Sequence, residues 1–271
     1  MRILHLTDVH FGGEEAAAAE AAVQFAADYA PAVTVFSGDL TLNGLPREFV
    51  PGRAWLDRLP RPLLHTPGNH DTPYWNLLLR ALVPFRRYRR YVGDPFSGGL
   101  DGDGFAVRMI NTSRGAQPRP DWSKGAINLE VCKGAAAELE AACPHGLRVV
   151  SCHHPLVEAT GAPVSGGVYR GELAAGLLAE RGVDLILSGH VHVPFAVPLP
   201  GGDKLTYAVG AGTLSVRTRG VPASFNTIEW TDELITVTAH AWTGERFDPF
   251  RAWSLPRRAR VRPQAPKPPQ V

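Results

Sequence analysis

The sequence has few cysteines and no long apolar run, which argues against a disulfide-stabilised protein and against a membrane-spanning one. Its three cysteines, Cys132, Cys143 and Cys152, are odd in number and lack the spacing of a disulfide framework. They are expected to be buried thiols in a reducing, cytoplasmic compartment. No run of about 18 apolar residues occurs, so no transmembrane helix is expected. The first apolar run begins at Arg2 and leads straight to potential metal ligands, so we expect no cleavable signal peptide.

Neither sign of charge is in large excess, since the net charge is only +2 over 271 residues. Six basic residues and no acidic one follow from Arg251 onward, which leaves about −4 for the remainder. Residues 256–271 are rich in Pro and Arg and are expected to form a disordered tail whose partner is unknown. Residues 1–255 are long enough for one domain with a substantial core. The composition indicates no clear nucleic-acid or membrane partner.

Apolar runs of strand length alternate with amphipathic stretches, which predicts an α/β domain. Helices are expected over residues 14–29, 47–59, 72–82, 129–143 and 172–181. Strands without ligands are expected over residues 105–110, 205–209, 225–230 and 234–242. The last two alternate in polarity and are separated by Thr231, Asp232 and Glu233, which predicts an antiparallel hairpin. The glycine-rich stretch 93–104 is interpreted as a loop.

Five further strand-like runs each end shortly before a side chain of a type that can bind metal ions. The seven side chains are Asp8 and His10 after residues 2–6, Asp39 after 33–37, Asn69 after 63–66, His153 after 148–152, and His190 and His192 after 185–188. Strands of an open α/β sheet place ligands beyond their carboxyl ends, where all of these residues fall. Each motif is weak evidence alone, and the ordered set is strong.

The residue types indicate the chemistry. Carboxylate, amide and imidazole groups suit divalent or trivalent Mn, Fe or Zn, and the absence of cysteine from the set argues against a thiolate zinc site. Seven ligands are too many for one ion with an open position but suit two ions that share a carboxylate. Two such ions clamp the attacking and leaving oxygens of an in-line displacement and lower the pKa of a bound water. We therefore expect hydrolysis at phosphorus.

These motifs in this order resemble the calcineurin-like metallophosphoesterase family, over residues 3 to about 215. The blocks are Asp8-Val9-His10, Gly38-Asp39, Gly68-Asn69-His70-Asp71, His153-His154-Pro155 and Gly189-His190-Val191-His192. The resemblance implies a four-layer α/β/β/α sandwich with two mixed sheets and a dinuclear site at the strand carboxyl edge. It also implies that Asp8, His10 and His192 hold one metal. Asn69, His153 and His190 would then hold the other, with Asp39 bridging.

By the same resemblance, His70 would be a catalytic histidine that does not bind metal and lies beside the phosphate. It would stabilise developing charge or protonate the leaving oxygen. His154 is expected to be structural, because its side chain should point away from that of His153. Asp71 has two equal interpretations, orienting the His70 ring or capping a helix that starts at Thr72.

The substrate is less well indicated. The segment 110–115 is similar to one in the small bacterial branch that hydrolyses cyclic nucleotides and glycerophosphodiesters, which makes Arg114 a candidate substrate ligand. Residues 85–91 carry four arginines and three aromatics, which indicates either an anion-binding stretch or a solvated helix face. Residues 210–217 are expected to approach the metal edge closely, helped by their glycines.

We expect hydrolysis of a small phosphodiester by a metal-bridging hydroxide, with phosphomonoesterase activity at the same centre as the alternative. A binding scaffold without activity is disfavoured, because all seven ligands and His70 are present. A nuclease would need a longer basic groove. A pyrophosphohydrolase of a lipid A precursor would need an apolar lid, for which the sequence offers no clear candidate.

Overall fold

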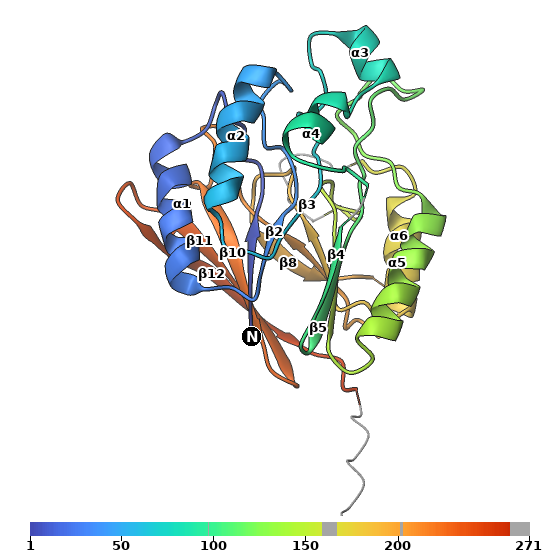
Figure 1. Cartoon of the computed structure of the whole chain (residues 1–271). Coiled ribbons are helices and arrows are strands. Elements are labelled where there is room, and N and C mark those ends of the chain that lie inside the picture. Colours follow the sequence, from blue (N-terminus) through green and yellow to red (C-terminus); the bar gives the residue numbers. More distant parts are fainter. Residues whose placement is uncertain (97, 159–166, 201–202, 261–271) are drawn as a thin grey trace, which may run out of the picture.

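Two six-stranded sheets pack face to face, with helices on both outer faces (Figure 1). The computed structural model describes residues 1–96, 98–158, 167–200 and 203–260. One apolar cluster lies between the sheets and includes Ile3, Val35, Val149 and Leu187. Each of two further apolar clusters lies between one sheet and the helices that cover it. The expected α/β/β/α sandwich with two mixed sheets is therefore confirmed.

The first sheet has the strand order β12-β11-β10-β1-β2-β3. Its strands are β1 (Arg2–Leu6), β2 (Val33–Phe36), β3 (Leu63–His65), β10 (Ser224–Trp230), β11 (Leu234–Trp242) and β12 (Phe247–Pro256). The first three are parallel to one another, and β10 runs antiparallel to β1. β10 and β11 form the predicted antiparallel hairpin. β1 and β2 are buried along almost their whole length, as their continuous apolar sequences require.

The second sheet has the order β4-β5-β6-β7-β9-β8. Its strands are β4 (Gly99–Gly102), β5 (Phe105–Met109), β6 (Leu147–Ser151), β7 (Leu185–Ser188), β8 (Phe195–Pro198) and β9 (Tyr207–Gly210). The four central strands β5, β6, β7 and β9 are parallel, and the two edge strands are antiparallel to their neighbours. Parallel strands bring their carboxyl ends to one edge, which is where the site lies.

Six helices complete the described part of the chain. They are α1 (Ala16–Tyr29), α2 (Pro46–Arg58), α3 (Leu77–Leu82), α4 (Arg86–Tyr91), α5 (Leu129–Ala142) and α6 (Gly171–Glu180). α1, α2 and α4 share the apolar cluster of the first sheet, and α5 and α6 that of the second. None of the helices in the described ranges is both long and apolar enough to cross a membrane.

Three sequence interpretations need correction. The stretch 93–104 contains β4, which pairs with β5 although its sequence is only Gly-Leu-Asp-Gly. The helix expected over 72–82 begins at Leu77, where Asn76 caps it by accepting a hydrogen bond from the backbone of Leu79 (2.9 Å). β12 was not predicted, because Pro249 breaks its pattern. The strand lies at the sheet edge and carries a register shift opposite Ala239 and His240, which makes room for that proline.

Residues 257–260 pack against the end of the second sheet. Arg258 and Arg260 both donate hydrogen bonds to the buried carboxylate of Asp184 (3.3 and 2.8 Å for the shortest contacts). Arg257 is itself buried and donates to the carbonyl oxygens of Thr231 and His145. Together with Pro256, the last residue of β12, these residues make five of the expected tail part of the folded chain. Residues 261–271 lie outside the described residues.

Candidate metal centre

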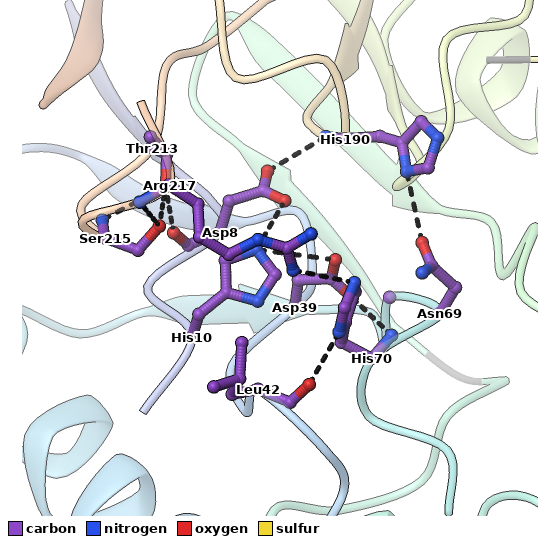
Figure 2. A network of polar contacts seen from close by, with 12 residues as sticks. Asp8, His10, Asp39, Leu42, Asn69, His70, His190, Thr213, Ser215 and Arg217 are labelled. Carbon is purple, nitrogen blue, oxygen red and sulfur yellow. Dashed lines mark hydrogen bonds and ion pairs between the residues drawn. The ribbon is translucent and has the colours of Figure 1, made fainter. Parts of the chain in front are cut away.

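The seven predicted ligands converge at the carboxyl ends of β1, β2, β3, β6 and β7. Asp8 and Asp39 follow β1 and β2 of the first sheet, whereas His153 and His190 follow β6 and β7 of the second. The Nε2 atom of His153 nevertheless lies 3.2 Å from Oδ2 of Asp39. The site therefore joins the two sheets across their common edge, and Figure 2 shows Asp8, Asp39, Asn69 and His190 around it.

The backbone at the site is unusual, because five of the seven residues have left-handed φ values. These are Asp8, His10, Asp39, His190 and His192, with φ between 54° and 67°. Residues other than glycine seldom adopt this backbone conformation. Strained backbone of this kind is often found at functional sites. The turns also need glycine. A Cβ atom on Gly68 would lie 2.0 Å from Oδ1 of Asp39, and one on Gly189 would lie 2.3 Å from Oδ2 of Asp8.

Asp8, His10 and His192 form one group of potential ligands. Oδ1 of Asp8 lies 3.1 Å from Nε2 of His192 and 3.5 Å from Nε2 of His10. Nδ1 of His192 donates to the carbonyl oxygen of Arg217 (2.7 Å), and Nδ1 of His10 donates to that of Thr41 (3.3 Å). In the neutral rings both Nε2 atoms then carry lone pairs, and they lie only 3.2 Å apart. A cation between them and the carboxylate would resolve this repulsion.

Asn69, His153 and His190 form the second group, and Asp39 lies beside it. Oδ1 of Asn69 lies 3.2 Å from Nε2 of His153 and 3.1 Å from Nδ1 of His190. Nε2 of His190 is buried without a hydrogen-bond partner among the described residues. Asp39 connects the groups, because its Oδ2 also lies 3.8 Å from Nε2 of His10.

The electrostatics of the site favour positive charge. Burial alone would lower the pKa of His153, but the adjacent Asp39 carboxylate overcomes it and raises that pKa to about 9. Burial would likewise raise the pKa of Asp8, but His192 and His10 hold it well below its ordinary value. Two buried carboxylates thus stay ionised among imidazoles. The donor set, the facing lone pairs and the unpartnered nitrogen all fit metal ions.

His70 lies at the rim of this group, and its contacts define its hydrogen positions. Nδ1 donates to the carbonyl oxygen of Leu42 (2.6 Å), so Nε2 accepts from the guanidinium of Arg217 (3.0 Å). Figure 2 shows these contacts. Burial, opposed by the Asp39 carboxylate, lowers the pKa of His70 to about 4. His70 is therefore neutral at pH 7 in this state, and Arg217 supplies the adjacent positive charge.

Arg217 was not singled out from the sequence, although residues 210–217 were expected to approach the metal edge. The loop is attached to the first ligand turn by Thr213, whose hydroxyl donates to the carbonyl oxygen of Asp8 (2.6 Å). Ser215 then accepts from the backbone nitrogen of Arg217 (3.2 Å). The available signal was the position of this loop, directly after a central parallel strand.

The family model for calcineurin-like phosphoesterases matches residues 1–194. The chain belongs to the calcineurin-like phosphoesterase family. This family hydrolyses phosphoesters with metal ions.

Solved structures show the same fold. The purple acid phosphatase PPD1 of yellow lupin (Lupinus luteus) is 14% identical with a TM-score of 0.69. The match covers 95% of this chain but 54% of the lupin chain, so this chain spans about half of that enzyme's length. TT1561 of Thermus thermophilus is 14% identical with a TM-score of 0.53, and 92% and 97% of the two chains are covered. No curated protein matches the sequence.

Arg114, the predicted substrate ligand, has its side chain bound to the backbone of its own loop. Its guanidinium donates to the carbonyl oxygens of Asn111 and Ser113 (3.3 and 2.9 Å). It lines a cavity of about 400 Å³ together with Phe96 and Val131, and none of the seven predicted ligands lines that cavity. Its role in substrate binding stays a prediction.

Two other residues of the motif blocks have structural contacts. Both ring nitrogens of His154 are occupied, by the hydroxyl of Thr112 (2.9 Å) and the carbonyl oxygen of Ser123 (2.8 Å), as a structural residue requires. The expectation that its side chain points away from that of His153 is wrong, because the two ring centroids lie 4.8 Å apart. Asp71 neither contacts the His70 ring nor caps a helix. Its carboxylate accepts from the backbone nitrogens of Thr41 (2.9 Å) and Gly68 (3.0 Å), so it holds two ligand loops together.

Proposed function

We propose that this phosphoesterase hydrolyses a small phosphodiester, such as a cyclic nucleotide or a glycerophosphodiester, at a dinuclear metal centre. The observation that carries the proposal is the convergence of seven oxygen and imidazole ligands with Asp39 between two groups. Asp8, His10 and His192 would hold one ion, and Asn69, His153 and His190 the other. When bound, Mn, Fe or Zn would supply positive charge and activation of water at neutral pH.

His70 and Arg217 would act on the substrate at the open side of this centre. The guanidinium of Arg217 presents a planar fork that suits two phosphate oxygens, and it stands 3.0 Å from His70. His70 is positioned by Leu42 so that Nε2 faces the same point. A phosphate that enters between the two would draw the guanidinium away from Nε2, and its negative charge would favour protonation of Nε2 from solvent. The protonated Nε2 could then donate its proton to the leaving oxygen.

The diester preference is supported by the similarity of residues 110–115 to the phosphodiesterase branch. Phosphomonoester hydrolysis at the same centre is the alternative, because the ligand groups serve both reactions equally. We also propose a reducing compartment such as the cytoplasm, because Cys132, Cys143 and Cys152 are all buried free thiols.

A comparison of two substrates tests the proposal. Purified protein reconstituted with Mn would be given bis-p-nitrophenyl phosphate and p-nitrophenyl phosphate at equal concentration. We expect a higher kcat/KM for the diester. A higher kcat/KM for the monoester would overturn the diester assignment and leave the metal centre intact. Protein treated with a chelator is the control, and it should hydrolyse neither compound.

A further inference from the structure

The short helix α3 exposes apolar side chains to solvent and buries its charged one. Three of its leucines point to solvent, with 58% of Leu77, 68% of Leu78 and 70% of Leu82 exposed. Its one arginine, Arg80, is only 6% exposed. Leu78 and Leu82 are four residues apart and share one face. A surface helix normally shows the opposite arrangement, so this apolar face is available to something outside the chain.

The reversal is fixed by specific contacts. The guanidinium of Arg80 donates to the carbonyl oxygens of Gly115 (3.0 Å) and Trp122 (2.9 Å), and its carbon lies 6.0 Å from the centre of the Trp122 ring. Rotating α3 to bury its leucines would break these hydrogen bonds and expose the arginine. The protein body therefore holds the leucines outward.

Aromatic side chains extend the apolar face toward the site. Trp75, 73% exposed, immediately precedes the helix, and Tyr74 stacks on the His70 ring (centroids 6.2 Å apart, planes at 8°). Figure 1 shows α3 projecting at the end of the molecule away from the N-terminus. The apolar face is thus continuous with the rim of the metal centre.

The charge around this face is mostly positive, although the exposed Asp94 lies next to Phe96. Residues 72–93 contain five arginines and no acidic residue. Arg80 and Arg87 are tied to backbone carbonyls, whereas Arg86, Arg89 and Arg90 of α4 are exposed. Arg89 lies over the exposed ring of Phe96 (5.5 Å to its centre). Exposed Trp and Leu next to basic residues are the combination that binds the interface of anionic membranes.

Other occupants fit less well. A second copy in a two-fold contact would place these arginines against their own counterparts. A single-stranded nucleic acid would stack on Trp75 and Tyr74 but would leave the leucines exposed, because aliphatic side chains offer no stacking surface. An anionic lipid surface satisfies the leucines, the aromatic rings and the arginines together.

We propose that the α3–α4 face, residues 74–90, docks the protein on an anionic lipid membrane. The metal centre would then open toward the headgroups. Membrane docking does not rest on the proposed phosphodiesterase activity. Vesicle binding tests the docking, and hydrolysis of the two phosphate esters tests the activity, so one proposal can fail without the other.

Vesicle sedimentation tests this proposal with the full chain. We expect the protein to sediment with vesicles of equal phosphatidylglycerol and phosphatidylcholine, and at least tenfold less with pure phosphatidylcholine. Leu78→Gln with Leu82→Gln should reduce binding at least tenfold, and Arg89→Gln with Arg90→Gln should weaken it and reduce its salt dependence. Leu173→Gln is the matched control, because Leu173 is 64% exposed on α6, which packs on the second sheet, and should bind as the unmodified protein does.

A second readout reports on the face directly. The tryptophan emission should shift to the blue on anionic vesicles, and Trp75→Phe should remove most of that shift. Equal binding to both vesicle types, or no binding, would overturn the proposal. So would a dimer in sedimentation velocity that dissociates in the Leu78→Gln, Leu82→Gln variant, because the face would then be a contact between copies. Hydrolysis of bis-p-nitrophenyl phosphate should be equal in the double-leucine variant and the unmodified protein.

Discussion

His70 and Arg217 are 147 residues apart in the sequence, yet the guanidinium of Arg217 donates to Nε2 of His70 at 3.0 Å. Arg217 also provides the carbonyl oxygen that accepts from Nδ1 of the potential ligand His192 (2.7 Å). One residue thus orients a ligand through its backbone and reaches His70 through its side chain. A substitution of Arg217 removes the contact to His70 but keeps the backbone carbonyl that orients His192, so the two roles can be tested separately.

Arg217→Ala should lower kcat/KM for bis-p-nitrophenyl phosphate about 10–100-fold, because a charge-assisted contact to phosphate is lost. The metal content, measured by mass spectrometry of the purified protein, should stay unchanged. Arg246→Ala is the matched control, since Arg246 is an exposed arginine paired with Asp248. An unchanged kcat/KM in Arg217→Ala would remove Arg217 from the substrate site.

His70→Ala should keep the metals and slow turnover about 10²–10⁴-fold, the usual contribution of a positioned acid or base. The loss should be largest for diesters with poor leaving groups, because these depend most on protonation. A series of aryl and alkyl phosphodiesters measures this dependence. Equal losses across the series, or loss of metal, would make His70 structural.

Gly68→Ala should destabilise the fold and reduce metal binding, because its Cβ would lie 2.0 Å from Oδ1 of Asp39. Thermal unfolding and metal content would both be measured. Gly134→Ala is the contrasting variant. Gly134 lies in α5 with no atom near its Cβ position, so alanine should stabilise the helix by about 0.5–1 kcal/mol. A stable, metal-loaded Gly68→Ala protein would contradict the close approach.

The stability of the fold should fall as the pH drops from 6.5 toward 4, partly through His65. Burial, with the charges of Arg53 and Arg61, lowers the pKa of His65 to about 4. The unfolded chain therefore binds a proton in this window that the folded chain does not, and stability rises with pH.

His65→Gln should reduce this pH dependence. The difference in unfolding free energy between pH 7 and pH 5 should shrink by about 1–2 kcal/mol relative to the unmodified protein. Urea unfolding at the two pH values measures it. An identical pH dependence in the variant would show that His65 is protonated equally in the folded and unfolded chains.

The convergence of the seven side chains could be predicted because each follows an apolar strand in a fixed order, and parallel strands end at one edge. Asp8 and His153 belong to different sheets, but both come after continuous apolar runs that are easy to recognise. Three of the four edge strands were missed, because β4 has almost no side chains to form a pattern, β8 spans only four residues and β12 contains Pro249. Local sequence carries little information where pairing with a neighbour decides the structure.

Arg217 and the exposed leucines of α3 escaped prediction for a different reason. Arg217 acquires its role from the position of a loop that Thr213 attaches to Asp8, a contact between residues 205 apart. Leu78 and Leu82 look like core residues in the sequence, and only the inward hydrogen bonds of Arg80 show that they point outward. Periodicity identifies an apolar face but not the side to which tertiary contacts turn it.

The central claim is a dinuclear centre bridged by Asp39, and metal stoichiometry tests it most directly. The metal-free protein would be titrated with Mn by calorimetry while hydrolysis of bis-p-nitrophenyl phosphate is followed, beside Asp39→Ala and the exposed control Asp57→Ala. We predict two ions per chain, with activity that needs both, in the unmodified protein and in Asp57→Ala. Asp39→Ala should lose at least one ion and more than about 100-fold in turnover, since changing even the groups behind metal ligands costs about 10–100-fold. Two bound ions and full activity in Asp39→Ala would contradict the account.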